Sequence, residues 1–468
     1  MTFTETVSSI NDFLNNIAWG WPTIILIFAA GLLLTIGSRF VQFGHFGHAM
    51  KQTVGQLGKK QSAGQGAVTP LQAVCTALAA TVGTGNITGV IGAICIGGPG
   101  AVFWMWVAAL LGMATKYSEV VLAIQYRERN EKGDWVGGPM YYIKNGMGKS
   151  WKWLGGLFCL LGMLASFGIG NMTQAKSIAT AITGAVQVFN ANANTNTVSL
   201  IVGIIIAVIV ALISLGGIKR IGAAAEKIVP VMSVIYIVAS LTVIFTHIGS
   251  LGSVFASIFQ GAFNPSAVAG GVLGVTISTV IKKGVARGIF SNEAGLGSAP
   301  MGHAAADTDH PVKQGMFGIF EVFMDTIVIC SMTALTVLCS GTDITWGSDS
   351  NSVAIATSAF ASVFSADIAG VVLAVALSLF ALTTILSWNL YGTRMCEYLL
   401  GPKAATVYKI IFLPMLLVGT TMSLDLAWGI ADTLNGLMAI PNLIALVVLS
   451  PVVFKLTKEY FAKRKAEK

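Results

Sequence analysis

Charged residues are scarce in this chain of 468 residues. Asp, Glu, Lys and Arg together make up 10% of it, whereas apolar residues make up 54%. A soluble globular domain carries about 25% charged residues, so most of the surface of this protein must face something other than water. Apolar runs of about 20 residues, long enough to cross a bilayer, recur along the chain. The composition therefore predicts a protein embedded in a lipid bilayer.

Several patterns that would indicate other classes of protein are missing. The net charge is +8, but the basic residues form short clusters between apolar runs instead of one patch, which argues against a nucleic-acid partner. None of the six cysteines has a C-x-x-C spacing, so neither a disulfide framework nor a zinc site is expected. The chain has no Gly-x4-Gly-Lys-Ser/Thr loop for ATP and no His-Glu-x-x-His pair. These absences argue against an ATP-driven pump and against an enzyme, and leave an ion gradient as the energy source.

The apolar runs predict an all-α protein with about eleven spans. One span stands alone at the start, and two sets of five follow it. Each set has an odd number of spans, so the two sets must have opposite topology, which is the inverted-repeat plan of many secondary transporters. The predicted spans are 21–43, 71–96, 101–124, 153–184, 198–215, 228–246, 264–288, 314–340, 367–393, 405–423 and 428–452.

This count divides the chain into four parts. Residues 1–69 hold the outside N-terminus, the extra helix and the first cytoplasmic loop, and 454–468 form a basic cytoplasmic tail. The first repeat is 70–250 and the second is 251–453. The N-terminus has no basic region or cleavage site, so no removable signal peptide is expected.

The distribution of Lys and Arg predicts the orientation in the cell membrane. The loops placed inside carry clusters of both residues, whereas the loops placed outside carry none. This asymmetry obeys the positive-inside rule, so we expect the N-terminus outside and the C-terminus in the cytoplasm. The loops without Lys or Arg are 1–20, 97–100, 186–197, 247–263, 341–366 and 424–427.

Residues 82–86 read Val-Gly-Thr-Gly-Asn in the middle of a predicted span. Two glycines and their polar neighbours weaken a helix, by about 1 kcal/mol per glycine relative to alanine. Unwound backbone at that depth survives only where it lines a cavity or is buried in protein. A broken helix there offers N–H groups to a carboxylate and C=O groups to sodium. The alternative is a packing face of small residues, formed by Gly85 and Gly89.

A second break is expected in the first span of the second set, at one of two places. Gly270, Gly271 and Gly274 lie at the equivalent depth. The other candidate is 291–295, which reads Ser-Asn-Glu-Ala-Gly and follows the cations Lys282, Lys283 and Arg287. We prefer the first place, because a span running inward from Pro265 would bring these cations to the cytoplasmic face.

Other polar residues within the spans have two interpretations each. The adjacent hydroxyls of Thr383 and Thr384 suit a small cation, but each could bond a carbonyl of its own helix. Trp388 shares a face with Thr384, and it could equally be a packing residue. The remaining residues of this kind are Asn171, Gln174 and Lys176 in one span, and Glu321 and Asp325 in another, which belong either to an ion pathway or to a structural network.

Two further groups favour a structural interpretation. Lys116 and Glu119 lie near a predicted cytoplasmic end, where snorkelling to the interface explains them. His303, Asp307, Asp309 and His310 resemble a metal cluster, but they lack a ligand spacing and precede Pro311, so helix capping and solvation are expected.

Several motifs together resemble the alanine or glycine:cation symporter family over nearly the whole chain. They are Gly-Thr-Gly-Asn-Ile-Thr-Gly at 83–89, Gly-Gly-Pro-Gly-Ala-Val-Phe-Trp-Met-Trp at 97–106, Gly-Asn-Met-Thr-Gln at 170–174, Phe-Ser-Asn-Glu-Ala-Gly-Leu-Gly at 290–297 and Phe-Ala-Leu-Thr-Thr at 380–384. The resemblance implies the leucine-transporter (LeuT) type of inverted-repeat fold with one extra N-terminal helix.

The resemblance also implies roles for single residues. The backbone of the first break would hold the substrate carboxylate, and a bulky Trp388 would favour a short side chain. Lys176 and Val272 depart from the pattern, because an uncharged residue and an aromatic are expected there. The implied substrate-binding residues are Gly83, Thr84, Gly85, Asn86, Gln174, Gly271, Val272, Thr276, Thr384 and Trp388, and the implied sodium ligands are the carbonyls of Ala79 and Val82 and the hydroxyls of Thr383 and Thr384.

The implied function is sodium-coupled symport of a small neutral amino acid, alanine or glycine, by alternating access. Some members of the family carry glutamine, so a glutamine symporter is one alternative. A channel is another, and it would need a continuous polar pore instead of two breaks.

Overall fold

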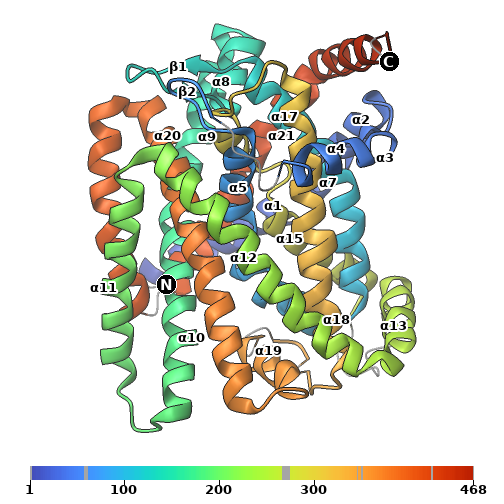
Figure 1. The fold of residues 1–468 in the computed structure, drawn as a ribbon, viewed down its shortest axis with the longest axis vertical. Helices are drawn as coiled ribbons and strands as arrows, with labels where there is room; N and C mark the ends of the chain where they lie inside the picture. Colours follow the sequence, from blue (N-terminus) through green and yellow to red (C-terminus); the bar gives the residue numbers. More distant parts are fainter. Residues whose placement is uncertain are drawn as a thin grey trace.

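The computed structural model describes residues 3–56, 62–265, 275–344, 346–348, 352–422 and 425–466. Most of its helices run along the long axis of the molecule (Figure 1). The elements, with 3-10 and π segments labelled η, are α1 (Phe3–Ala18), α2 (Trp21–Gly37), α3 (Val41–Gly44), α4 (Phe46–Val54), α5 (Pro70–Thr81), η1 (Thr84–Asn86), α6 (Thr88–Gly97), α7 (Gly100–Gln125), β1 (Glu128–Arg129), β2 (Trp135–Val136), α8 (Pro139–Tyr142), η2 (Ile143–Met147), η3 (Lys149–Trp151), α9 (Lys152–Phe167), η4 (Gly168–Met172), α10 (Thr173–Phe189), α11 (Thr195–Ser214), α12 (Gly217–Thr246), η5 (Ile248–Ser250), α13 (Leu251–Phe263), α15 (Ile277–Asn292), α16 (Pro300–His303), α17 (Pro311–Val322), η6 (Phe323–Cys330), α18 (Ser331–Cys339), α19 (Ser352–Ala361), α20 (Ala366–Thr421) and α21 (Asp425–Ala466).

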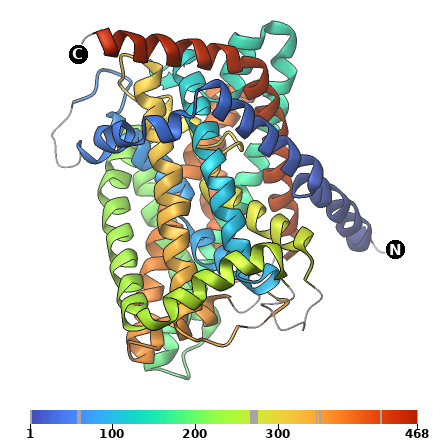
Figure 2. The same ribbon diagram turned by 90° about the vertical axis from the view of Figure 1, so that its right-hand side faces the viewer.

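The two ends of the bundle carry different segments. The antiparallel pair β1–β2, α8 and the C-terminal part of α21 lie at one end, and Figure 2 shows α21 lying across it. The turn between α10 and α11, together with α13 and α19, lies at the other end (Figure 1). The charge pattern assigns these two groups to opposite sides of the membrane. Which end faces the cytoplasm stays a prediction.

Eight helices among the described residues are long and apolar enough to cross a membrane, or nine if the bent pair α5 and η1–α6 is one span. The helix α20 has 56 residues, which at 1.5 Å per residue is far longer than a hydrocarbon core of about 30 Å. It contains a break at Gly401, whose φ is 85°, followed by Pro402. Two predicted spans, 367–393 and 405–423, therefore lie on either side of this break. The total of eleven spans and the repeat bounds stay predictions.

The irregular spans are explained by their backbones. The predicted break at 82–86 is present, because α5 ends at Thr81 and the next helical segment is bent by 59° from it. The span 153–184 is interrupted by the π-helical turn η4, at Gly168–Met172. The outside segment 1–20, in contrast, is no simple loop, since α1 occupies most of it. Asn15 of α1 donates to the carboxylate of Asp432 at 3.2 Å and so attaches α1 to the start of α21.

A buried break follows α15, at the second of the two candidate places. The helix α15 continues to Asn292, and the buried irregular segment follows it at 293–299. The preferred place, at Gly270, Gly271 and Gly274, lies outside the described residues.

The charge argument for the preferred place expected Lys282, Lys283 and Arg287 at the cytoplasmic end of their helix. That argument failed because these cations lie toward the other end. A Cβ at Gly97 would lie 3.4 Å from Cβ of Lys283, and one at Gly284 would lie 2.3 Å from the carbonyl oxygen of Ala101. The beginnings of α15 and α7 therefore lie side by side, at the end that the loop charges place outside. Lys282 also lies 5.7 Å from the ring centre of Trp21, in a cation–π contact.

The apolar core lies between the long helices of both halves. Its largest fully buried side chains include Trp388 and Tyr391 of α20, Tyr117 of α7 and Phe158 of α9. All six cysteines are buried and free. The centre of the bundle is therefore dry, and any ionisable group within it needs a partner in the protein.

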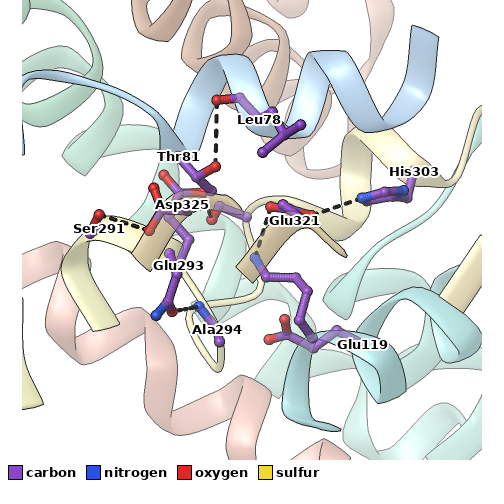
Figure 3. A network of polar contacts seen from close by, with 12 residues as sticks. Leu78, Thr81, Glu119, Ser291, Glu293, Ala294, His303, Glu321 and Asp325 are labelled. Atoms are coloured by element: carbon purple, nitrogen blue, oxygen red, sulfur yellow. Dashed lines mark hydrogen bonds and ion pairs between the residues drawn. The ribbon is translucent and has the colours of Figure 1, made fainter. Parts of the chain in front are cut away.

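A buried ion pair connects α7 to α17 within this core (Figure 3). Lys116 Nζ lies 3.4 Å from Oε1 of Glu321, and both side chains are fully buried. His303 Nε2 contacts the other oxygen of Glu321 at 2.9 Å, and its Nδ1 contacts Gln314 at 2.9 Å. Glu119 is also buried, where it accepts hydrogen bonds from Asn442 and from the backbone N–H of Gly295.

The expectation that Lys116 and Glu119 snorkel to the interface is therefore wrong, because their partners come from distant helices that turn them inward. The residues that resemble a metal cluster are not brought together either. His303 joins the buried network, whereas Asp309 pairs with Lys313 on the surface and the ring of His310 accepts from the N–H of Val312 at the start of α17.

We expect Lys116→Met to lower the melting temperature by several degrees, because it leaves a buried carboxylate without its cation, at a cost of about 3–5 kcal/mol. Removing the charge of both partners, with Lys116→Met and Glu321→Gln together, should recover part of the loss. The measurement is the fraction of monodisperse protein after heating in detergent. The control is Asp309→Asn, which breaks an ion pair whose side chains are 42% and 72% exposed and should cost less than about 1 kcal/mol. A double variant no more stable than Lys116→Met alone would contradict this explanation.

Candidate functional site

The first helix break brings backbone close to α20. Thr69 starts α5 with a reciprocal capping box, in which its hydroxyl accepts from the N–H of Gln72. After α5, Gly83 is extended, with φ −127° and ψ −164°. A Cβ at this position would lie 2.6 Å from Oγ1 of Thr384, closer than real contacts allow. Glycine is therefore required here because α20 lies so close to the backbone of the first break.

The second break follows α15. Glu293 ends that helix in the left-handed conformation, with φ 53°, and Gly295 and Gly297 also have positive φ. The whole segment is buried. Its backbone is supported by side chains, since Asn292 Oδ1 accepts from the N–H of Ala294 at 2.9 Å and Asn442 donates to the carbonyl of Gly295 at 2.9 Å.

Asn86 connects the two breaks. Its Oδ1 accepts from the N–H of Gly83 at 2.8 Å, which holds the first break in shape. Its Nδ2 donates to Oγ of Ser291 at 2.8 Å and to Oδ1 of Asp325 at 2.6 Å. Ser291 in turn donates to the second oxygen of Asp325 (Figure 3). One buried amide therefore joins η1, α15 and η6.

A small cavity lies between the two breaks, η4, α20 and α21. The centre of a water-sized sphere can move within about 20 Å³ of it. Polar groups in it come from the two breaks and from Gln174 of α10, Thr384 of α20 and Asn435 of α21, and Trp388 and Phe290 supply aromatic surface. The lining residues are Ala80, Thr81, Gly83, Gly85, Ile169, Gln174, Phe290, Ser291, Glu293, Thr384, Trp388 and Asn435.

Most of the predicted substrate-binding residues meet at this cavity. Gly83, Gly85, Gln174, Thr384 and Trp388 line it. Two more lie next to it: Thr84, whose hydroxyl donates to Oε1 of Gln174 at 3.0 Å, and Asn86, which holds the break behind it. Gly271 and Val272 lie outside the described residues.

The placement of Thr276 at the site is wrong. Its hydroxyl caps the first turn of α15 by accepting from the N–H of Thr279 at 3.2 Å, and the residue is exposed. The cavity lies at the other end of α15, which at 1.5 Å per residue is more than 20 Å away.

The predicted cation ligands lie where α5 crosses α20. Oγ1 of Thr384 is 3.4 Å from the carbonyl oxygen of Ala80. In the sequence, Ala80 lies between Ala79 and Val82, whose carbonyls are the predicted sodium ligands. Both hydroxyls also bond their own helix, Thr384 to Phe380 at 2.9 Å and Thr383 to Leu379 at 3.0 Å. The hydroxyls and the carbonyl end of α5 are therefore neighbours in a buried region.

Seven lining residues were not predicted, namely Ala80, Thr81, Ile169, Phe290, Ser291, Glu293 and Asn435. Three of these, Phe290, Ser291 and Glu293, lie in the motif 290–297, which the sequence pattern placed toward the cytoplasm. The signal that could have located them is the pair Gly295 and Gly297, separated by one residue like Gly83 and Gly85. The described residues contain no group of three or more His, Cys, Asp or Glu side chains that could hold a metal ion.

The chain is similar in sequence to known transporters over its full length. A profile of the sodium:alanine symporter family matches residues 4–468. The sodium/alanine symporter AgcS of Methanococcus maripaludis is 42% identical, and the match covers 100% of this chain and 99% of that protein. The probable sodium/glutamine symporter GlnT of Bacillus subtilis is 38% identical, with 99% and 93% covered.

The fold is similar to that of solved transporters. The crystal structure of MhsT in complex with L-phenylalanine matches 86% of this chain and 99% of its own, with a TM-score of 0.58 and 12% identity. At that identity the likeness shows the fold alone, which is the LeuT type that the motifs implied. The chain is a secondary transporter and not an enzyme, and it belongs to the sodium:alanine symporter family.

Proposed function

We propose that this protein carries a small neutral amino acid, alanine or glycine, into the cell together with sodium. The observation that carries the proposal is the buried cavity between two helix breaks, with α5 ending on one side and α15 on the other. Helix ends present unpaired backbone groups and partial charges. A site of this kind suits a ligand that is itself charged at both ends.

The substrate carboxylate binds at the first break. The N–H groups that begin the short helical segment at Thr84 have no acceptor within their own turn, and they mark the positive end of the half-helix that continues into α6. Gly83 and Gly85 line the cavity at this point, so the ligand can approach the backbone without a side chain in the way.

Sodium binds between α5 and α20. Hard oxygen ligands suit a small cation, and the carbonyls of Ala79 and Val82 mark the negative end of α5. Thr384 adds its hydroxyl from α20 close to this end, and Thr383 is its neighbour. Because Gly83 lies against Thr384, an ion at this point would hold α20 to the same break that holds the substrate. This contact supports coupled transport by alternating access.

The walls of the cavity favour a short side chain. Trp388 is 1% exposed, and a Cβ at Gly170 would lie 2.2 Å from that of the tryptophan. The indole is therefore packed tightly against η4, which restricts its movement. Alanine and glycine fit such a site better than glutamine, and the AgcS protein of the same family is a sodium/alanine symporter by name. Glutamine remains the alternative substrate.

We expect Thr384→Ala to raise the sodium concentration for half-maximal alanine uptake about tenfold or more, because it removes one ligand of the ion. The measurement is uptake of radiolabelled alanine into proteoliposomes with an inward sodium gradient. Thr393→Ala is the matched control, since its hydroxyl bonds only a carbonyl of the same helix, that of Asn389 at 2.6 Å.

Three results would change the proposal. Equal sodium dependence in wild type and Thr384→Ala would show that the ion does not bind at Thr384. Uptake that ignores sodium would contradict coupling, and uptake that never saturates would favour a channel.

We expect Trp388→Leu to shift the selectivity toward larger amino acids, because it opens space above the substrate side chain. In wild type, unlabelled alanine and glycine should displace labelled alanine much better than glutamine does. In the variant, the ratio of the inhibition constants of glutamine and alanine should fall about tenfold. A constant ratio, with both constants changed alike, would mean that the indole does not set the size limit.

A further inference from the structure

Glu293 is the one ionisable side chain among the lining residues of the cavity. It lies at the end of α15, on the wall opposite the first break, and Figure 3 shows it beside the buried network of Ser291 and Asp325. Only 3% of the residue is exposed. Its carboxyl group is therefore shielded from solvent at the edge of the cavity.

The backbone at this position is unusual for a residue with a side chain. Glu293 has φ 53° at the end of a helix, where glycine or asparagine is the common choice because of the left-handed conformation. Glycines do occupy positive φ at 295 and 297 in the same segment. A strained conformation that persists at a ligand site points to a function for the side chain that adopts it.

The present partners of this carboxylate are neutral. Oε1 accepts from Nε1 of Trp388 at 3.1 Å, and Oε2 accepts from the hydroxyl of Ser298. No Lys, Arg or His of the described residues lies within 4.0 Å of it in an ion pair. A buried carboxylate without a cation is costly, so the site favours a positive group next to Glu293.

Lys116 does not supply that group. It interacts electrostatically with three carboxylates, those of Glu321, Glu119 and Glu293, and its ion pair is with Glu321 at 3.4 Å. The cation of Lys116 is therefore held by Glu321, away from Glu293.

We infer that Glu293 binds the ammonium group of the transported amino acid. The assignment rests on the proposed function and adds to it the chemistry that selects the substrate. The carboxylate of the zwitterion lies at the first break, at the N-terminal end of a half-helix. The ammonium lies at the second break, where the C-terminal dipole of α15 and the Glu293 carboxylate both favour a cation.

This arrangement selects α-amino acids against analogues that lack the charge. Lactate has the carboxylate and the methyl group of alanine, but it has a hydroxyl in place of the ammonium. A buried charged group that loses its partner is costly, and sites built to pair with a substrate group reject the analogue without it strongly. Wild-type protein should therefore bind alanine far more tightly than lactate.

The test is the ratio of the affinities for alanine and lactate, measured on purified full-length protein in nanodiscs with saturating sodium. Each compound displaces radiolabelled alanine, or heat of binding is recorded where the label binds weakly. Glu293→Gln retains acceptor and shape for Trp388 and Ser298 but removes the charge, and Glu293→Asp retains the charge on a shorter chain. The matched control is Glu321→Gln, which removes one buried charge that pairs with Lys116 at a residue outside the cavity lining.

We expect Glu293→Gln to weaken alanine binding about 30-fold or more, as for a lost buried charge partner, and to change lactate binding less than about threefold. The ratio should collapse in this variant, recover in part in Glu293→Asp, and change less than threefold in Glu321→Gln. Equal losses for alanine and lactate would overturn the inference, because they indicate a role in shaping the site. An equal collapse in Glu321→Gln would overturn it too, because the net charge of the network would then be the cause. Wild-type protein that binds no neutral amino acid would instead overturn the proposed function itself.

Discussion

Two stretches of unwound backbone within a membrane bundle must find their hydrogen-bond partners inside the protein, because hydrocarbon offers none. This requirement explains the most connected residue of the site. Asn86 bonds the N–H of Gly83 in its own break and then reaches Ser291 and Asp325 beside the other. Each break is thus satisfied partly by the other half of the chain, so neither can change shape alone. A movement that opens the cavity at one end must alter bonds at both.

The same requirement explains why so many ionisable side chains are buried near the breaks. Glu119 accepts the N–H of Gly295, and Glu293 ends the helix before it. Carboxylates buried together need a cation among them, and Lys116 is that cation. It interacts with Glu119 and Glu293 and pairs with Glu321, which also contacts His303. Such a network contributes little net stability, but it fixes which groups face each other. The polar side of the cavity is a consequence of this arrangement.

Local signals in the sequence predicted local structure well. The glycine pair at 83 and 85 indicated the first break because glycine acts on the backbone at its own position. The break that follows α15 was not the preferred one, because the charges of Lys282, Lys283 and Arg287 argued against it, and charge alone does not say at which end of a helix a residue lies. The same preference led to the assignment of Thr276, which is exposed at the start of α15. Lys116 was read as a surface residue because its partner, Glu321, is 205 positions away in the chain, and no periodicity reveals such a contact.

The arrangement also bears on why a zwitterion could drive closure where a simple ion does not. The two breaks belong to different parts of the fold and present opposite ends of helix dipoles to one cavity. A ligand with charges of both signs can interact with both at once, and its differential affinity for the closed state is what shifts the equilibrium. A ligand with one charge can satisfy only one break and leaves the other as it was. Sodium bound at the end of α5, as proposed, would also hold α20 through Thr384. Ion and substrate would then favour the same closed arrangement through adjacent residues, 83 and 82, of a single break.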